Sequence, residues 1–135
     1  MRIEHIGIAI SNEEKSKNLF ERLLGASPYK AELVVSEQVQ TIFFNEKETK
    51  IELLLATNET SVIKKFIDKK GEGIHHIAFG VDDLMAEISR LKLAGFEFVN
   101  EIPKQGADNK RIVFLHPRST NGILIELCET IQSAI

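Results

Sequence analysis

The chain of 135 residues is long enough for one domain with a sizeable core, and its 43% hydrophobic and 27% charged residues exclude wholesale disorder. A formal net charge of -3 gives no basic footprint for nucleic acid. The sequence has no apolar run of membrane-spanning length, no signal-peptide pattern, and one cysteine, Cys128, which cannot form an internal disulfide. These features predict a cytoplasmic protein with neither a nucleic-acid nor a membrane partner.

The first half of the chain reads as a strand, a helix and further strands. Residues 3–10 alternate in side-chain size, as a strand does. Residues 11–14 read as a capping box, and apolar residues at helical spacing then continue to a stop at Gly25. Strand-like segments follow over 39–44 and 50–54.

The second half repeats this order after a short linking helix predicted over residues 60–70. A helix capped by Asp82 or Asp83 and ended at Gly95 takes the place of the first helix. The strand-like segments of this half cover 74–81, 110–115 and 124–128.

The two halves match residue by residue where each begins. Ile3, His5 and Ile6 lie over Ile74, His76 and Ile77 at a constant offset, with small residues at equivalent positions after each histidine. A single sheet of this size would leave one face bare, whereas two copies can cover each other and form a cleft. We therefore predict an α+β fold within one domain, residues 1–135. It contains two βαβββ modules, about 1–57 and 73–130, which form a cupped mixed sheet.

Four polar residues occupy equivalent positions in the repeated strands: His5, Glu52, His76 and Glu126. A lone histidine or glutamate on a strand usually faces solvent, and the alternation around the glutamates allows that interpretation. A carboxylate in an otherwise apolar strand is costly to bury unless it is paired or bound to a metal. Because all four fall on symmetric positions, the pattern favours a divalent transition-metal site with positions open to substrate or water.

The strand–helix–three-strand plan with His-Glu-His-Glu at these positions resembles the glyoxalase fold, or vicinal oxygen chelate superfamily, over roughly residues 1–130. The resemblance implies a cupped sheet around a divalent metal held by these four residues. It also implies a homodimer.

Two families within the superfamily compete. Bacterial glyoxalase I carries a His, Glu, His, Glu ligand set, which implies nickel or cobalt, with zinc as the alternative, and a glutathione hemithioacetal substrate. Segments 73–79, 114–120 and 122–127 of this chain resemble methylmalonyl-CoA epimerase. The substrate of that family is a thioester. We place glyoxalase I first because of the ligand set, with the epimerase as the alternative. A third hypothesis is a drug-binding protein without catalysis, against which the four retained ligands argue.

Both reactions remove a proton from carbon next to a carbonyl, through an enediolate that a metal stabilises. We predict Glu126 as ligand and base and Glu52 as its partner. Some epimerases have glutamine at the position of Glu52 and a second catalytic glutamate one strand earlier, where this chain has Thr41. For that reason the base on this side of the substrate is predicted to be Glu52.

Substrate binding is assigned to a basic loop near the second module's strands. Lys104, Lys110 and Arg111 could hold the phosphates of coenzyme A or a carboxylate of glutathione. The alternative is that these three residues form a solvated basic loop with no ligand.

Overall fold

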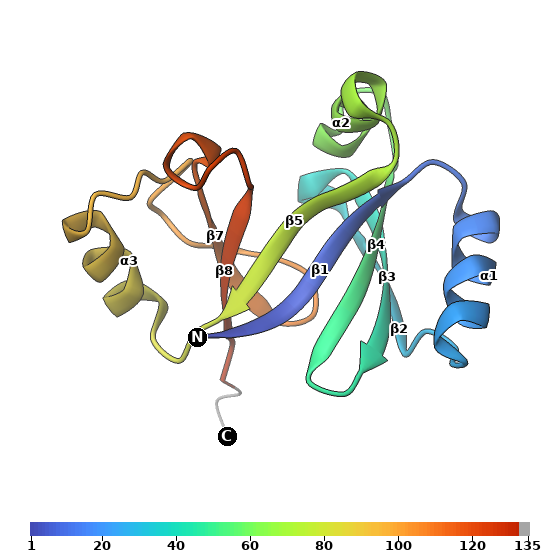
Figure 1. The fold of residues 1–135 in the computed structure, drawn as a ribbon, viewed down its shortest axis with the longest axis horizontal. Coiled ribbons are helices and arrows are strands. Elements are labelled where there is room, and N and C mark those ends of the chain that lie inside the picture. Colours follow the sequence, from blue (N-terminus) through green and yellow to red (C-terminus); the bar gives the residue numbers. More distant parts are fainter. Residues whose placement is uncertain (133–135) are drawn as a thin grey trace. The chain divides into compact units, whose positions relative to one another are not determined.

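The computed structural model describes residues 1–132, so the last three residues of the predicted domain, 133–135, lie outside the description. The chain divides into two compact units (Figure 1). The N-terminal unit holds residues 5–75, and the C-terminal unit holds residues 1–4 together with the described chain from residue 76 to residue 132.

The N-terminal unit contains most of β1, then α1, β2, a 3₁₀ turn, β3, β4 and α2. Their bounds are Arg2–Ile10, Glu13–Leu24, Lys30–Val34, Val35–Glu37, Val39–Glu46, Thr49–Ala56 and Val62–Lys70. The strands lie in the order β2-β3-β4-β1. β1 pairs with β4 in parallel, and the other two pairings are antiparallel.

The C-terminal unit repeats this plan with most of β5, then α3, β6, β7, a 3₁₀ turn and β8. Their bounds are Gly73–Gly80, Leu84–Leu93, Lys104–Gln105, Lys110–Leu115, Pro117–Ser119 and Ile125–Thr130. The strand order is β5-β8-β7-β6, again with the parallel pair formed by the first and last strands of the unit. The predicted α+β class and the twofold βαβββ order are confirmed.

Helix ends follow the predicted capping residues. The Asn12 side chain accepts a hydrogen bond from the Lys15 amide at 3.0 Å, and Gly25 ends α1 with φ of 66°. Of the two caps predicted for α3, Asp83 is the one that accepts from a helix amide. Ser61 caps the linking helix, which begins at Val62 instead of at residue 60.

No helix in residues 1–132 has the length and apolar character needed to cross a membrane.

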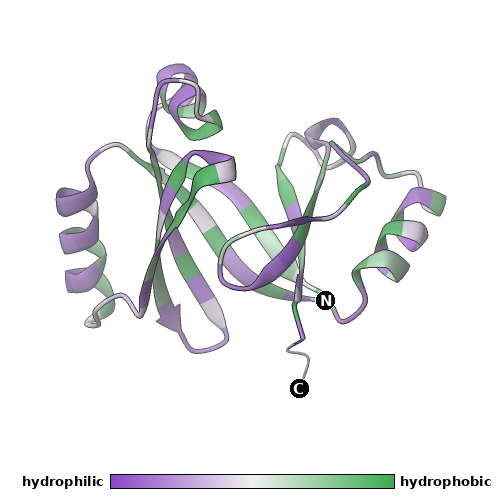
Figure 2. Ribbon diagram, turned by 180° about the vertical axis from the view of Figure 1, so that it is seen from behind, coloured by the Kyte–Doolittle hydropathy of each residue, from purple (hydrophilic) through white to green (hydrophobic). Residues whose placement is uncertain are grey.

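The strands of each unit are covered on one face by the helix that follows the first strand of that unit. Helix α1 has no fully buried residue and is mostly hydrophilic (Figure 2), but the half-buried Phe20 and Leu24 pack against the apolar face of β1, β3 and β4. Helix α3 contributes three buried residues, Leu84, Ile88 and Leu91, to the core of the C-terminal unit. Because side chains alternate along a strand, the other face of each sheet carries a second, different set of residues.

Helix α2 covers one end of that second face in the N-terminal unit. Its buried Ile63 packs with Ala9, Val39 and Leu54, and the half-buried Phe66 lies against the same cluster. These apolar contacts exclude solvent from this end of the face. Polar residues of the same face lie further along the strands.

A close approach fixes the loop between β6 and β7. The Gly106 amide donates to the Lys110 carbonyl at 2.9 Å, and a Cβ at Gly106 would lie 2.9 Å from Cδ1 of the buried Ile112. We expect Gly106→Ala to lower the free energy of unfolding by about 1–3 kcal/mol, the usual cost of overpacking, measured by urea denaturation.

Ile112→Val supplies the control because it removes the Cδ1 atom that the new methyl group would meet. The double variant should recover part of the loss seen in Gly106→Ala alone. A Gly106→Ala variant as stable as the parent would contradict the close packing of this loop.

Candidate metal centre

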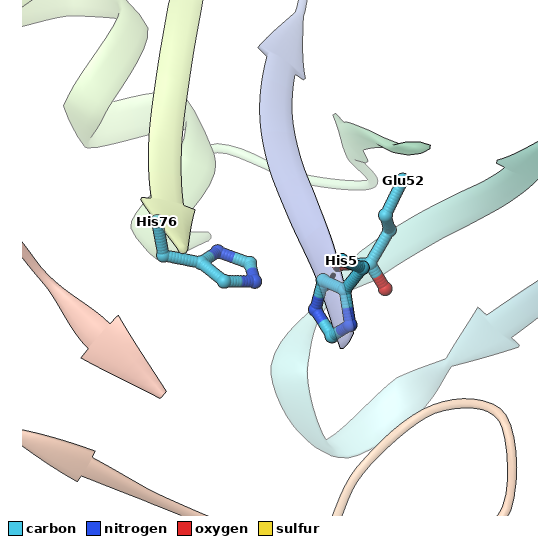
Figure 3. A group of neighbouring side chains, drawn as sticks. All are labelled: His5, Glu52 and His76. Atoms are coloured by element: carbon cyan, nitrogen blue, oxygen red, sulfur yellow. Dashed lines mark ion pairs between the residues drawn. The ribbon is translucent and has the colours of Figure 1, made fainter. Parts of the chain in front are cut away.

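The first His–Glu pair lies on β1 and β4 of the N-terminal unit. Gly7 is the register partner of Glu52 in the parallel pairing, so alternation places His5 and Glu52 on the same face of the sheet. The His5 Nε2 atom lies 3.4 Å from Oε1 of Glu52, and each side chain is only 6% exposed (Figure 3). The cost of burying the carboxylate is thus offset by a histidine partner.

The second pair has the same construction on β5 and β8 of the C-terminal unit. Ala78 is the register partner of Glu126, which places His76 and Glu126 on one face. Their Nε2 and Oε1 atoms are 3.6 Å apart, and the side chains are 4% and 7% exposed. The glycine-or-alanine residue two positions after each histidine leaves that part of the face without a bulky side chain. We call the face with the pair the site face of each unit.

These four side chains supply the atoms that a divalent transition metal prefers. His5, Glu52 and His76 are all buried and each offers a ligand atom, and Glu126 offers a second carboxylate. Imidazole nitrogen with carboxylate oxygen suits zinc, nickel, cobalt, iron and manganese. The donor set of the chain therefore fits a divalent ion.

Phe114 lies beside the His76–Glu126 pair on the same face of the C-terminal unit. It lies directly opposite Glu126 in the β7–β8 register, and its ring meets the His76 ring edge to face at 5.9 Å and 89°. The half-buried ring packs with Ile112 and lines the site face.

The three predicted basic residues occupy three different environments. Lys104 is exposed, and its ammonium lies over the Phe114 ring at 6.0 Å. Lys110 is buried and its Nζ atom donates to Thr130 Oγ1 at 2.7 Å. The β7–β8 register points Arg111 to the face opposite Glu126, where it pairs with Glu129 at 2.8 Å.

Sequence analysis did not single out Glu4, which the structure places within this network. Glu4 is buried and its carboxylate lies 3.9 Å from the Lys110 ammonium. A charged residue inside an N-terminal strand was the signal available for it. The ion pair ties the start of β1 to the C-terminal unit and leaves Lys110 little access to solvent.

Thr41 is fully buried on the site face of the N-terminal unit, and its hydroxyl donates to the Glu32 carbonyl at 3.0 Å. The side chain carries no titratable group. Glu52, on the neighbouring strand β4, is a buried carboxylate of the same face.

Cys128 follows Glu126 by two positions on the site face. Burial, and secondly the negative charge of Glu126, raise the pKa of its thiol to about 12. The group stays protonated at neutral pH and is a poor nucleophile in that form. Cys128 thus acts as a packing residue beside Ile112 and Ala78.

The twofold fold and its two buried His–Glu pairs can now be compared with known protein families. Residues 4–114 match the model of the Glyoxalase/Bleomycin resistance protein/Dioxygenase superfamily. The chain belongs to this superfamily.

Several members of the superfamily are similar to this chain over nearly its whole length. The chain is 38% identical to the ethylmalonyl-CoA/methylmalonyl-CoA epimerase of Cereibacter sphaeroides, covering 93% of this chain and 96% of that one. It is 37% identical to the uncharacterized protein YqjC of Bacillus subtilis, covering 95% and 91%. A solved methylmalonyl-CoA epimerase variant from Streptomyces coelicolor, in complex with 2-nitronate-propionyl-CoA, is 30% identical. It aligns with a TM-score of 0.88 over 99% of each chain.

Proposed function

We propose that the two His–Glu pairs bind one divalent metal ion, with His5 and Glu52 from one unit and His76 and Glu126 from the other. The support is the equivalence of the pairs, their burial, and a donor set that suits such an ion. Nickel or cobalt, as predicted from the ligand set, stays a prediction, as does the homodimer.

We infer that the protein is a methylmalonyl-CoA epimerase-type isomerase that acts on an acyl-CoA thioester. The observation that carries this inference is the set of buried pairs in a chain that has, over nearly its whole length, relatives named as epimerases of such thioesters. Our sequence analysis placed glyoxalase I first. The relatives favour the alternative, so the order of the two is reversed.

The reaction removes one proton from the α-carbon and delivers another to the opposite face of the same carbon. A divalent ion, when bound, withdraws electron density from the thioester carbonyl and makes the neighbouring C–H bond more acidic. The Glu126 carboxylate takes this proton, and the electron pair of the C–H bond passes into the thioester system. Glu52, protonated, delivers a proton to the opposite face of the same carbon, which inverts the centre.

The small residues after each histidine leave room above the pairs for the reacting carbon. Buried surroundings strengthen the electrostatic contribution of every charged group at the site. The Phe114 ring excludes water from one side of His76.

A paired assay tests the proposal. Metal-loaded protein is incubated with methylmalonyl-CoA in deuterium oxide, and separately with the hemithioacetal of methylglyoxal and glutathione. We expect deuterium to enter the α-position of the CoA ester with inversion, and no lactoylglutathione to form. Turnover of the hemithioacetal alone would restore glyoxalase I, and turnover of neither substrate would contradict both assignments.

A further inference from the structure

A row of three side chains leads away from the second His–Glu pair along the site face of the C-terminal unit. His76 contacts the Phe114 ring edge-on, and the Lys104 ammonium lies over that ring at 6.0 Å. Lys104 is the register partner of Ile112, which places it on the same face as Phe114. One aromatic ring therefore separates an exposed cation from the proposed metal ligand.

The Phe114 ring gives this cation a defined position. An ammonium over an aromatic face is attracted by the ring quadrupole, by about 0.5–1 kcal/mol at an exposed site. The β6–β7 hydrogen bond from the Gly106 amide holds the loop next to it. Lys104 can meet a ligand here, whereas Lys110 is buried against Thr130 and Glu4, and Arg111 faces the other way.

A ligand that extends from the His76–Glu126 pair across the Phe114 ring meets the Lys104 ammonium, which attracts an anionic group. A malonyl-type thioester has such a group, since its free carboxylate is attached to the carbon that loses the proton. The phosphates of coenzyme A are much farther from the thioester when the pantetheine arm is extended. We propose that Lys104 binds the free carboxylate of the acyl group and selects thioesters that carry one.

This inference rests on the proposed function, but its test measures binding and does not depend on turnover. The probes are methylmalonyl-pantetheine and propionyl-pantetheine, which lack phosphates and differ in the free carboxylate. Calorimetric titration into metal-loaded protein gives the affinity ratio of the two. We expect Lys104→Met to reduce the preference for the carboxylate on the order of tenfold, the value of one charged hydrogen bond.

Lys104→Arg should retain most of the preference, because it keeps the charge. Lys92→Met is the matched control: the same substitution removes an exposed lysine of α3 that pairs with Glu101 at 3.0 Å. This variant should keep the parent ratio.

Three results would overturn the inference. In the first, Lys104→Met weakens both pantetheine esters equally, which indicates a structural effect. In the second, Lys104→Met leaves both pantetheine esters unaffected and weakens only methylmalonyl-CoA and propionyl-CoA, titrated in parallel, which assigns the lysine to a phosphate. In the third, the ratio does not change at all. A parent protein that prefers the carboxylate through Lys104 and yet does not epimerise it would refute the proposed function alone.

Discussion

Replacing Glu126 by glutamine will leave the fold intact and lower turnover of methylmalonyl-CoA by about 100- to 10,000-fold, the usual contribution of a general base. Glutamine has nearly the same shape as glutamate and keeps an oxygen that can face a metal. It cannot accept and return a proton near neutral pH. The measurement is kcat at saturating metal and substrate, because a weaker metal site then no longer limits the rate.

Glu129→Gln is the matched control on the same strand. Glu129 points to the other face of β8 and pairs with Arg111 there, so its loss removes a carboxylate of the same strand without touching the site face. Such exposed pairs contribute up to about 1 kcal/mol. We expect parent turnover from this variant. Near-parent turnover from Glu126→Gln would refute the base assignment.

The metal content of Glu126→Gln distinguishes a loss of the catalytic base from a loss of the ion. If Glu126→Gln binds metal with parent stoichiometry but turns over slowly, the carboxylate acts on the proton. If the variant binds no metal at any concentration tested, loss of the ion accounts for the lost turnover, and the expectation that glutamine preserves the metal site is wrong.

The strand positions of the four site residues could be predicted from sequence because a repeat carries more information than a single pattern. Alternation alone left both glutamates ambiguous, since apolar Leu53 and Leu127 follow them directly. The match of His5 to His76 predicted which side chains of the first strand in each half share a face. The observed registers place each glutamate on the same face as the histidine of its own unit.

Contacts between residues distant along the chain could not be predicted in this way. Lys110 and Arg111 are neighbours in a basic loop, and nothing local distinguishes them. Strand β7 begins at Lys110 and turns the two side chains to opposite faces, and Glu4 from the start of the chain then buries Lys110. The face on which Lys104 lies is set by its pairing with Ile112 in β6, a strand of two residues. Such a strand is too short to be predicted from alternation in the sequence.

Removal of either histidine ligand will abolish metal-linked stabilisation of the whole protein. An ion that binds the native state at 100 times its dissociation constant adds about 2.7 kcal/mol to the free energy of unfolding. We therefore expect EDTA to lower the melting temperature of the parent. His5→Ala and His76→Ala should melt at the same temperature with and without EDTA.

His75→Ala is the control for the histidine variants. His75 precedes His76 on β5, so alternation points its side chain to the opposite face. There its ring packs edge-on against Phe66, with the ring centroids 5.0 Å apart. Its burial lowers the pKa of the imidazole to about 4, so the side chain is neutral at pH 7 and its removal changes no charge there. The variant can lose packing stability, but it should keep the full response to EDTA.

The two ligand variants also decide between one shared ion and two separate ions. If the pairs share one ion, metal analysis gives one ion per parent chain, and each single substitution lowers the bound metal of the whole chain because the ion loses one of its four donors. If each pair held its own ion, His5→Ala would keep the ion of the His76–Glu126 pair and half of the metal. That second outcome would contradict the shared centre on which the two-carboxylate proton transfer depends.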